Sequence, residues 1–77
     1  MGILYITNVD AIASEDVIAS IHGALQEIGC LKIFKRYADG DIDAEYFKDE
    51  HLHEAIKTLN HKPFGDRPLN LFNNDEM

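Results

Sequence analysis

The 77-residue sequence contains no tryptophan and a single cysteine, and it has half as many basic as acidic side chains. Because one cysteine cannot form an internal disulfide, the chain fits a reducing compartment, and we expect Cys30 to be a small, buried, apolar side chain. The 7 lysines and arginines against 14 aspartates and glutamates give a net charge of −7. This charge is opposite to the one expected of a nucleic-acid-binding surface, so the composition disfavours acidic partners.

Long apolar runs are absent as well. No segment approaches the length of a membrane span, and no charged-then-apolar signal segment opens the chain. We therefore expect a soluble intracellular protein, cytoplasmic or nuclear, that has no membrane partner.

The residues that catalysis needs are not grouped in the sequence. The many carboxylates lack a Ser, Cys or His partner in obvious range, and no glycine-rich loop is present to hold a phosphate. We expect no enzyme activity, no cofactor and no small-molecule substrate.

Hydrophobic periodicity divides the chain into six elements. We expect strands at residues 3–9, 31–37, 41–47 and 69–72, a helix at 14–28 with Ser14 as N-cap and Gly29 at its end, and a helix from Asp49 through Leu59 with Asp49 as N-cap. The order βαββαβ predicts an α+β, ferredoxin-like plait, in which two helices cover one face of a four-stranded antiparallel sheet. One domain is expected over residues 1–72, followed by a flexible tail at 73–77.

A tight hairpin is expected between the second and third strands. Asp39 and Gly40 both tolerate positive φ, which predicts a two-residue type I′ turn. In that register Arg36 stands opposite Asp43. The second-strand residues expected to share the open sheet face with the acids are Lys32, Phe34 and Arg36.

Several segments resemble the motifs of one family. Residues 39–46 (DGDIDAEY) have the frame of the eight-residue RNA-reading motif of RNA recognition modules, and residues 4–9 (LYITNV) are similar to the six-residue first-strand motif. Residues 46–56 and 59–69 are similar to the family's second helix and to its exit into the last strand. The chain thus resembles the RNA recognition motif (RRM) family over nearly its whole length, which implies a place in an RNA-processing ribonucleoprotein complex.

The RNA-reading positions depart from that family. Tyr5 keeps the first-strand aromatic, but Asp41 and Asp43 replace the two base-stacking rings of the third strand. A carboxylate has no π-face, and at about 4 Å in water it repels a phosphate by roughly 1 kcal/mol. The sequence therefore predicts a noncanonical member that binds proteins, with weak or absent RNA binding. The alternative is a weak single-stranded RNA binder that uses Tyr5, Lys32, Phe34 and Arg36.

The back of the first helix is one candidate protein-binding surface. Ala19, His22, Gly23 and Gln26 are expected on its solvent side, and Gly23 costs about 1 kcal/mol relative to alanine inside a helix. A glycine at this position would allow another helix to approach closely, which is one reason for the chain to tolerate that cost. The partner would be a second copy or another RRM-like domain.

The loop after the second helix is another candidate. Lys62-Pro63-Phe64 resembles the Arg-x-Phe motif of UHM domains, the RRM variants that bind a tryptophan-bearing peptide. This resemblance implies a peptide-docking loop that uses Lys62 and Phe64.

Metal binding is the remaining alternative. Asp39, Asp41, Asp43 and Glu50 nearly reproduce an EF-hand calcium loop, but Ala44 stands where that loop needs glycine and the preceding segment alternates like a strand. The histidines do not have the spacing of zinc ligands on one helix face. We therefore expect no metal site.

Overall fold

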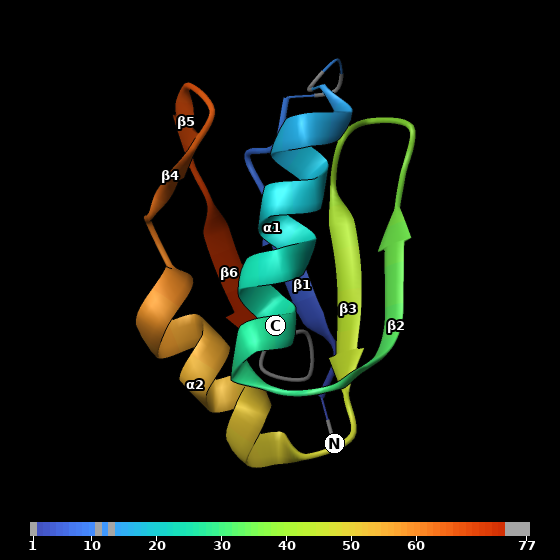
Figure 1. The fold of residues 1–77 in the computed structure, drawn as a ribbon, viewed down its shortest axis with the longest axis vertical. Coiled ribbons are helices and arrows are strands. Elements are labelled where there is room, and N and C mark those ends of the chain that lie inside the picture. The colour runs from blue at the N-terminus through green and yellow to red at the C-terminus, as the bar shows by residue number, and fades with distance from the viewer. Residues whose placement is uncertain (1, 11, 13, 74–77) are drawn as a thin grey trace.

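The computed structural model describes residues 2–10, 12 and 14–73. Its elements, in chain order, are β1 Leu4–Thr7, α1 Glu15–Ile28, β2 Leu31–Arg36, β3 Ile42–Tyr46, α2 Asp49–Leu59, β4 Pro63–Phe64, β5 Arg67–Pro68 and β6 Asn70–Asn73. Four antiparallel strands form a sheet in the order β2-β3-β1-β6, and both helices lie on the same side of it (Figure 1). The predicted α+β plait is confirmed.

Alternation along the strands places one set of side chains beneath the helices. Leu4 and Ile6 of β1 and Ile42 and Ala44 of β3 have no exposed surface. The core is completed by Val9, Tyr46 and residues from the helices and the last segment: Ile21, Leu25, Leu52, Ala55, Leu59, Leu69 and Leu71. Because the side-chain period of a strand is two, Tyr5, Asp41 and Asp43 lie on the opposite side.

The helix starts differ in how they are capped. Ser14 is the N-cap of α1, and its Oγ accepts a hydrogen bond from the Val17 amide at 3.4 Å, as predicted. The predicted cap at Asp49 is wrong, because Lys48 is the N-cap of α2 and makes no side-chain cap bond. Asp49 instead lies in the first turn, where its negative charge interacts favourably with the positive end of the helix dipole.

The hairpin between β2 and β3 has a three-residue loop, so the predicted type I′ turn is wrong. The Tyr37 amide donates to the Asp41 carbonyl at 2.8 Å, and the Gly40 amide donates to the Tyr37 carbonyl at 3.0 Å. Gly40 has a φ of 99°, which fits the loop type in which a type I turn is followed by a left-handed glycine. Asp39 Oδ1 accepts from the Asp41 amide at 3.0 Å and holds the turn.

The extra loop residue shifts the register by one position. Lys35, not Arg36, is the partner of Asp43, and Arg36 lies opposite Ile42. The register shifts again between Leu31 and Ile33, so that Lys32 lies in a β-bulge of this edge strand.

Three further expectations differ from the structure. Cys30 is exposed, not buried, because it follows the end of α1 and precedes β2. The loop after α2 contains a small hairpin of β4 and β5. Asn73, assigned to the tail, is the last residue of β6, while the tail positions 74–77 lie outside the described residues. Among the helices of the described ranges, none has the length and apolar character that a membrane span requires.

Candidate functional site

The sheet side away from the helices, here named the open face, carries a row of four side chains. Lys35 of β2, Asp43 of β3, Tyr5 of β1 and Phe72 of β6 are consecutive cross-strand partners. Phe72 is 42% exposed. Since neighbouring strands lie about 4.8 Å apart, this row places an amine, a carboxylate and two rings side by side.

More apolar surface lies around that row. Ile33 is 46% exposed and pairs with Glu45, which places both on the open face. Tyr37 is 39% exposed, and its hydroxyl reaches Asp43 from the end of β2. The open face thus combines acidic groups with exposed rings and an aliphatic side chain.

Phe34 and Arg36, expected on the open face, lie on the helix side, because the register differs by one residue. Phe34 pairs with the buried Ala44, and its ring stacks on His22 of α1 with centroids 4.3 Å apart. Arg36 pairs with Ile42, and its Nη2 donates to the Asp10 carbonyl at 3.4 Å. The prediction that these two residues share the acidic face is therefore wrong.

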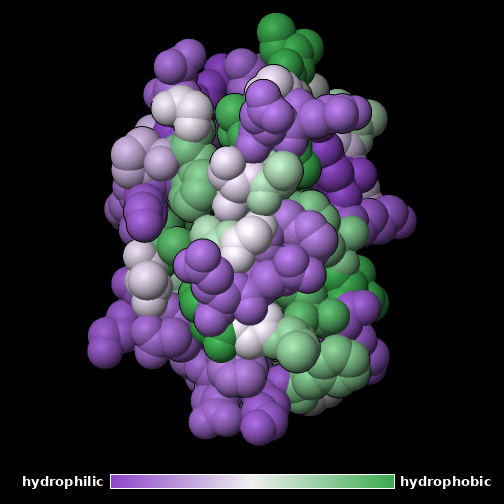
Figure 2. Space-filling model, in the orientation of Figure 1, coloured by the Kyte–Doolittle hydropathy of each residue, from purple (hydrophilic) through white to green (hydrophobic). Residues whose placement is uncertain are grey.

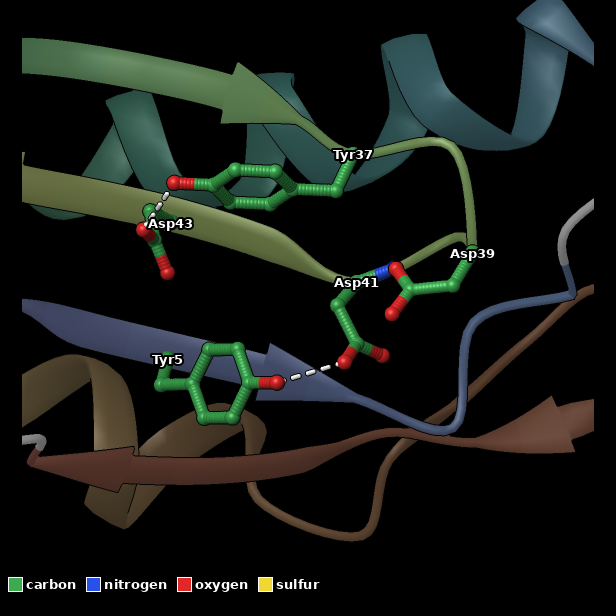
Figure 3. Close-up of a pocket in the computed structure, with 5 residues that line it drawn as sticks. All are labelled: Tyr5, Tyr37, Asp39, Asp41 and Asp43. Atoms are coloured by element: carbon green, nitrogen blue, oxygen red, sulfur yellow. Dashed lines mark hydrogen bonds between the residues drawn. The ribbon is translucent and has the colours of Figure 1, made fainter.

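A cavity opens at the loop end of the open face. It has a volume of about 310 Å³ and is lined by Tyr5, Tyr37, Asp39, Asp41 and Asp43. Figure 3 views it from the open face, with the helices behind the sheet. The two tyrosines extend from β1 and from the end of β2, and the acids belong to β3 and its loop. This cavity is named the Tyr–Asp pocket below.

Each carboxylate of the Tyr–Asp pocket is held by a hydrogen bond. The Tyr5 hydroxyl donates to Asp41 Oδ2 at 2.5 Å, and the Tyr37 hydroxyl donates to Asp43 Oδ2 at 2.6 Å. Asp39 is held by the Asp41 amide. The acids therefore have fixed positions, and each retains a second carboxylate oxygen that is not used in these bonds.

The same bonds change the acidity of the tyrosines. The hydrogen bond to Asp41, together with desolvation and the charges of the pocket aspartates, raises the pKa of Tyr5 to about 12. The hydrogen bond to Asp43, with desolvation, raises the pKa of Tyr37. Both phenols are therefore neutral donors at physiological pH.

One cation already lies at the pocket's edge. The Lys35 Nζ lies 5.1 Å from the centroid of the Tyr37 ring, within the range of a cation–π contact. The ring face of Tyr37 thus accepts a positive charge within this structure.

The sequence predicts Tyr5, Asp41 and Asp43 as residues of this site, but not Tyr37. Its role depends on the loop length, because the one-residue shift is what sets Tyr37 opposite Asp41. The available signal was Gly40, which suits the left-handed position of a three-residue loop as well as a type I′ turn.

The α1 surface lies on the other side of the molecule, which Figure 2 shows. Ala19 and Gln26 are exposed, and an added Cβ on Gly23 would meet no atom within 4 Å. His22 is half-buried by its stacking on Phe34. An interaction through this surface stays a prediction.

The candidate peptide-docking loop lies beside α1. Lys62 is exposed, whereas Phe64 is half-buried and packs against the core. Phe64 also lines a second cavity of about 230 Å³, together with Val17 and Ile21 of α1. Peptide docking at this place stays a prediction too.

The metal alternatives gain no support from the geometry. Over residues 2–10, 12 and 14–73, no group of three or more His, Cys, Asp or Glu side chains is placed to hold a metal ion. Strand β2 occupies the segment where an EF-hand requires its entering helix.

Comparison with known proteins places the fold. No protein-family model matches the sequence, and no curated protein matches it. Solved structures do match. The RRM domain of S. pombe Puf1 is 20% identical with a TM-score of 0.75, and the match covers 94% of each chain. RNA Binding Protein PG1 is 19% identical with a TM-score of 0.79, over 95% of this chain and 93% of the other.

A third match is the Rna15 RRM solved with bound RNA (GU). It is 18% identical with a TM-score of 0.75, over 92% of this chain and 80% of the other. At these identities the likeness concerns the course of the backbone. The chain has the fold of RNA recognition motif domains.

Proposed function

We propose that this chain is a noncanonical RRM that acts as a protein-interaction module, and that its open face binds a basic segment of a partner protein. The single observation that supports this proposal is the Tyr–Asp pocket, in which hydrogen bonds hold three carboxylates beside two tyrosine rings. We place this module in an RNA-processing ribonucleoprotein complex on the strength of its likeness to RRM domains. No chemistry is proposed for it.

Charge argues against RNA as the ligand of this face. Each carboxylate repels a phosphate by roughly 1 kcal/mol at about 4 Å in water, so three of them weaken binding by roughly 3 kcal/mol at most, or about 100-fold. The net charge of −7 adds a long-range repulsion. Lys35 at the pocket's edge offsets only part of the local charge, because it contributes one positive charge against three carboxylates.

The same groups favour a cation. A guanidinium or ammonium near the carboxylates gains the Coulomb energy that a phosphate loses, and contact with a tyrosine face adds about 0.5–1 kcal/mol. Exposed Ile33 and Phe72 can bury apolar side chains of the same segment. A short peptide with basic and apolar residues therefore complements the open face.

Single-stranded RNA remains a second candidate, and one observation favours it. Tyr5 and Phe72 are cross-strand neighbours on the open face, and Phe72 is exposed, so two rings are available for bases to stack on. The Rna15 domain with this fold is solved with RNA bound.

Binding measurements decide between the two. Fluorescence anisotropy is recorded at low salt with two labelled probes, a lysine- and arginine-containing peptide and a single-stranded RNA pool. We expect the peptide to bind at least about tenfold more tightly than the RNA, and Asp41→Lys to abolish peptide binding. Glu27→Lys, at an exposed α1 position, makes the same change in net charge and is the matched control. RNA binding tighter than about 10 μM, with no peptide binding, contradicts the proposal.

A further inference from the structure

We infer that the Tyr–Asp pocket receives one arginine side chain of the partner and prefers it to lysine. This inference rests on the proposed function, because it names the group that a basic segment would insert. The occupant is a guanidinium whose plane lies against a tyrosine ring while its N–H groups reach the aspartates.

The directions in which the pocket's side chains point support the inference that the ligand is a planar cation. Tyr5 and Tyr37 approach the β3 acids from opposite sides, and their hydroxyls point at Asp41 and Asp43 (Figure 3). The two rings therefore flank the carboxylates, which suits a ligand that is both flat and a multiple donor. A guanidinium has five N–H donors in one plane and stacks on aromatic faces.

The pocket has room for such a side chain. An engineered cavity of about 150 Å³ admits benzene, and the Tyr–Asp pocket has about twice that volume, about 310 Å³. It is open to solvent, so the aliphatic stem can lead back to a peptide lying across the sheet.

The fixed positions of the aspartate carboxylates are the reason that the pocket prefers arginine to lysine. Because Asp39, Asp41 and Asp43 are already held by hydrogen bonds, little side-chain freedom is lost when they accept more donors. A guanidinium can bond two acceptors at once, whereas an ammonium is a compact, strongly hydrated point charge.

Two synthetic peptides test the inference. They have the same length, apolar residues and net charge, and differ only in carrying arginine or lysine at every basic position. Isothermal titration calorimetry with the intact chain gives the dissociation constant of each. We expect the arginine peptide to bind about fivefold more tightly. In Tyr37→Leu and in the conservative variant Asp41→Asn this ratio falls to about one.

Glu45→Gln is the matched control. Glu45 is an acid of the open face that does not line the pocket, so its loss weakens both peptides by a similar factor and leaves their ratio unchanged. Backbone amide shifts of each variant show whether the sheet is intact.

The outcomes separate this inference from the proposed function. Equal binding of both peptides to the wild-type chain overturns the arginine preference and leaves the basic-segment proposal standing. A ratio that persists in both pocket variants places the arginine elsewhere and also overturns it. Failure of both peptides to bind overturns both ideas.

Discussion

Replacing Asp43 with phenylalanine tests whether carboxylates are what separates this sheet from an RNA-binding platform. Asp43 lies between Tyr5 and Lys35 in the row across the open face, so the new ring would lie beside Tyr5. One added stacking surface contributes about 1–3 kcal/mol per base, and loss of one carboxylate removes about 1 kcal/mol of repulsion. The expected gain of about 2–4 kcal/mol corresponds to roughly 30- to 700-fold tighter RNA binding.

Asp43→Asn separates the two contributions. It removes the charge and adds no ring, so we expect a gain of about 1 kcal/mol, or roughly fivefold. Asp43 is only half-buried, and its bond from the Tyr37 hydroxyl is exposed, so neither substitution removes a core contact. The assay is fluorescence anisotropy with a labelled single-stranded RNA pool at low salt.

The reasoning is refuted if Asp43→Phe binds RNA no more tightly than the wild type while its amide spectrum shows a folded sheet. It is also refuted if the asparagine and phenylalanine variants gain equally, because charge alone would then account for the effect.

Three further predictions concern single groups. Gly23→Ala should raise the free energy of unfolding by about 1 kcal/mol and the Tm by about 4–8 °C, because alanine is the better helix former and its Cβ meets no atom within 4 Å. Thermal denaturation followed by circular dichroism measures the change. Asp41→Asn should lower the Tyr5 pKa from about 12, and tyrosinate absorbance should then appear at a lower pH. In the wild type the folded state raises this pKa above its usual value of about 10. The stabilisation from the Tyr5–Asp41 bond is therefore complete below a pH of about 10 and is lost as the pH rises through about 12. Lys35→Ala should tighten binding of the basic peptide by about two- to fivefold, because it removes the cation that competes for the Tyr37 ring. Lys32→Ala is the control, since it makes the same charge change and leaves Lys35 over that ring. Equal effects of the two variants on the dissociation constant, measured by calorimetry, would contradict this prediction.

The predicted faces of β1 and β3 are confirmed because a buried side sets the register of these strands. Leu4 and Ile6 alternate with Tyr5, and only one side of this strand can lie beneath the helices. The placement of Asp41 and Asp43 on the open face follows from the same alternation.

Strand β2 was harder to predict because its faces were assigned from the turn. One additional loop residue moves the side chains of residues 33–36 to the other face, so Lys35 and Ile33 lie on the open side in place of Arg36 and Phe34. A sequence of mixed basic and apolar residues has no internal pattern to correct such an error. Both Phe34 and Ile33 suit a buried position, and only the register distinguishes them.

The hydrogen bonds of the Tyr–Asp pocket could not be predicted for the same reason. The Tyr5–Asp41 bond joins residues far apart in the chain and so depends on sheet order, whereas the Tyr37–Asp43 bond depends on the register of the hairpin. The exposure of Cys30 likewise depends on the short connection between α1 and β2, whose path the sequence pattern does not fix.

The bulge at Lys32 affects how copies of this molecule meet in concentrated solution. An edge strand offers its unpaired amides and carbonyls as a template for a strand of another chain. In β2 the bulge interrupts that template, and Lys32 and Lys35 place two exposed ammonium groups along it. Edge-to-edge stacking into fibrils is thereby disfavoured at the β2 edge of the sheet. A protein that binds along this edge is recognised through side chains and not through main-chain pairing.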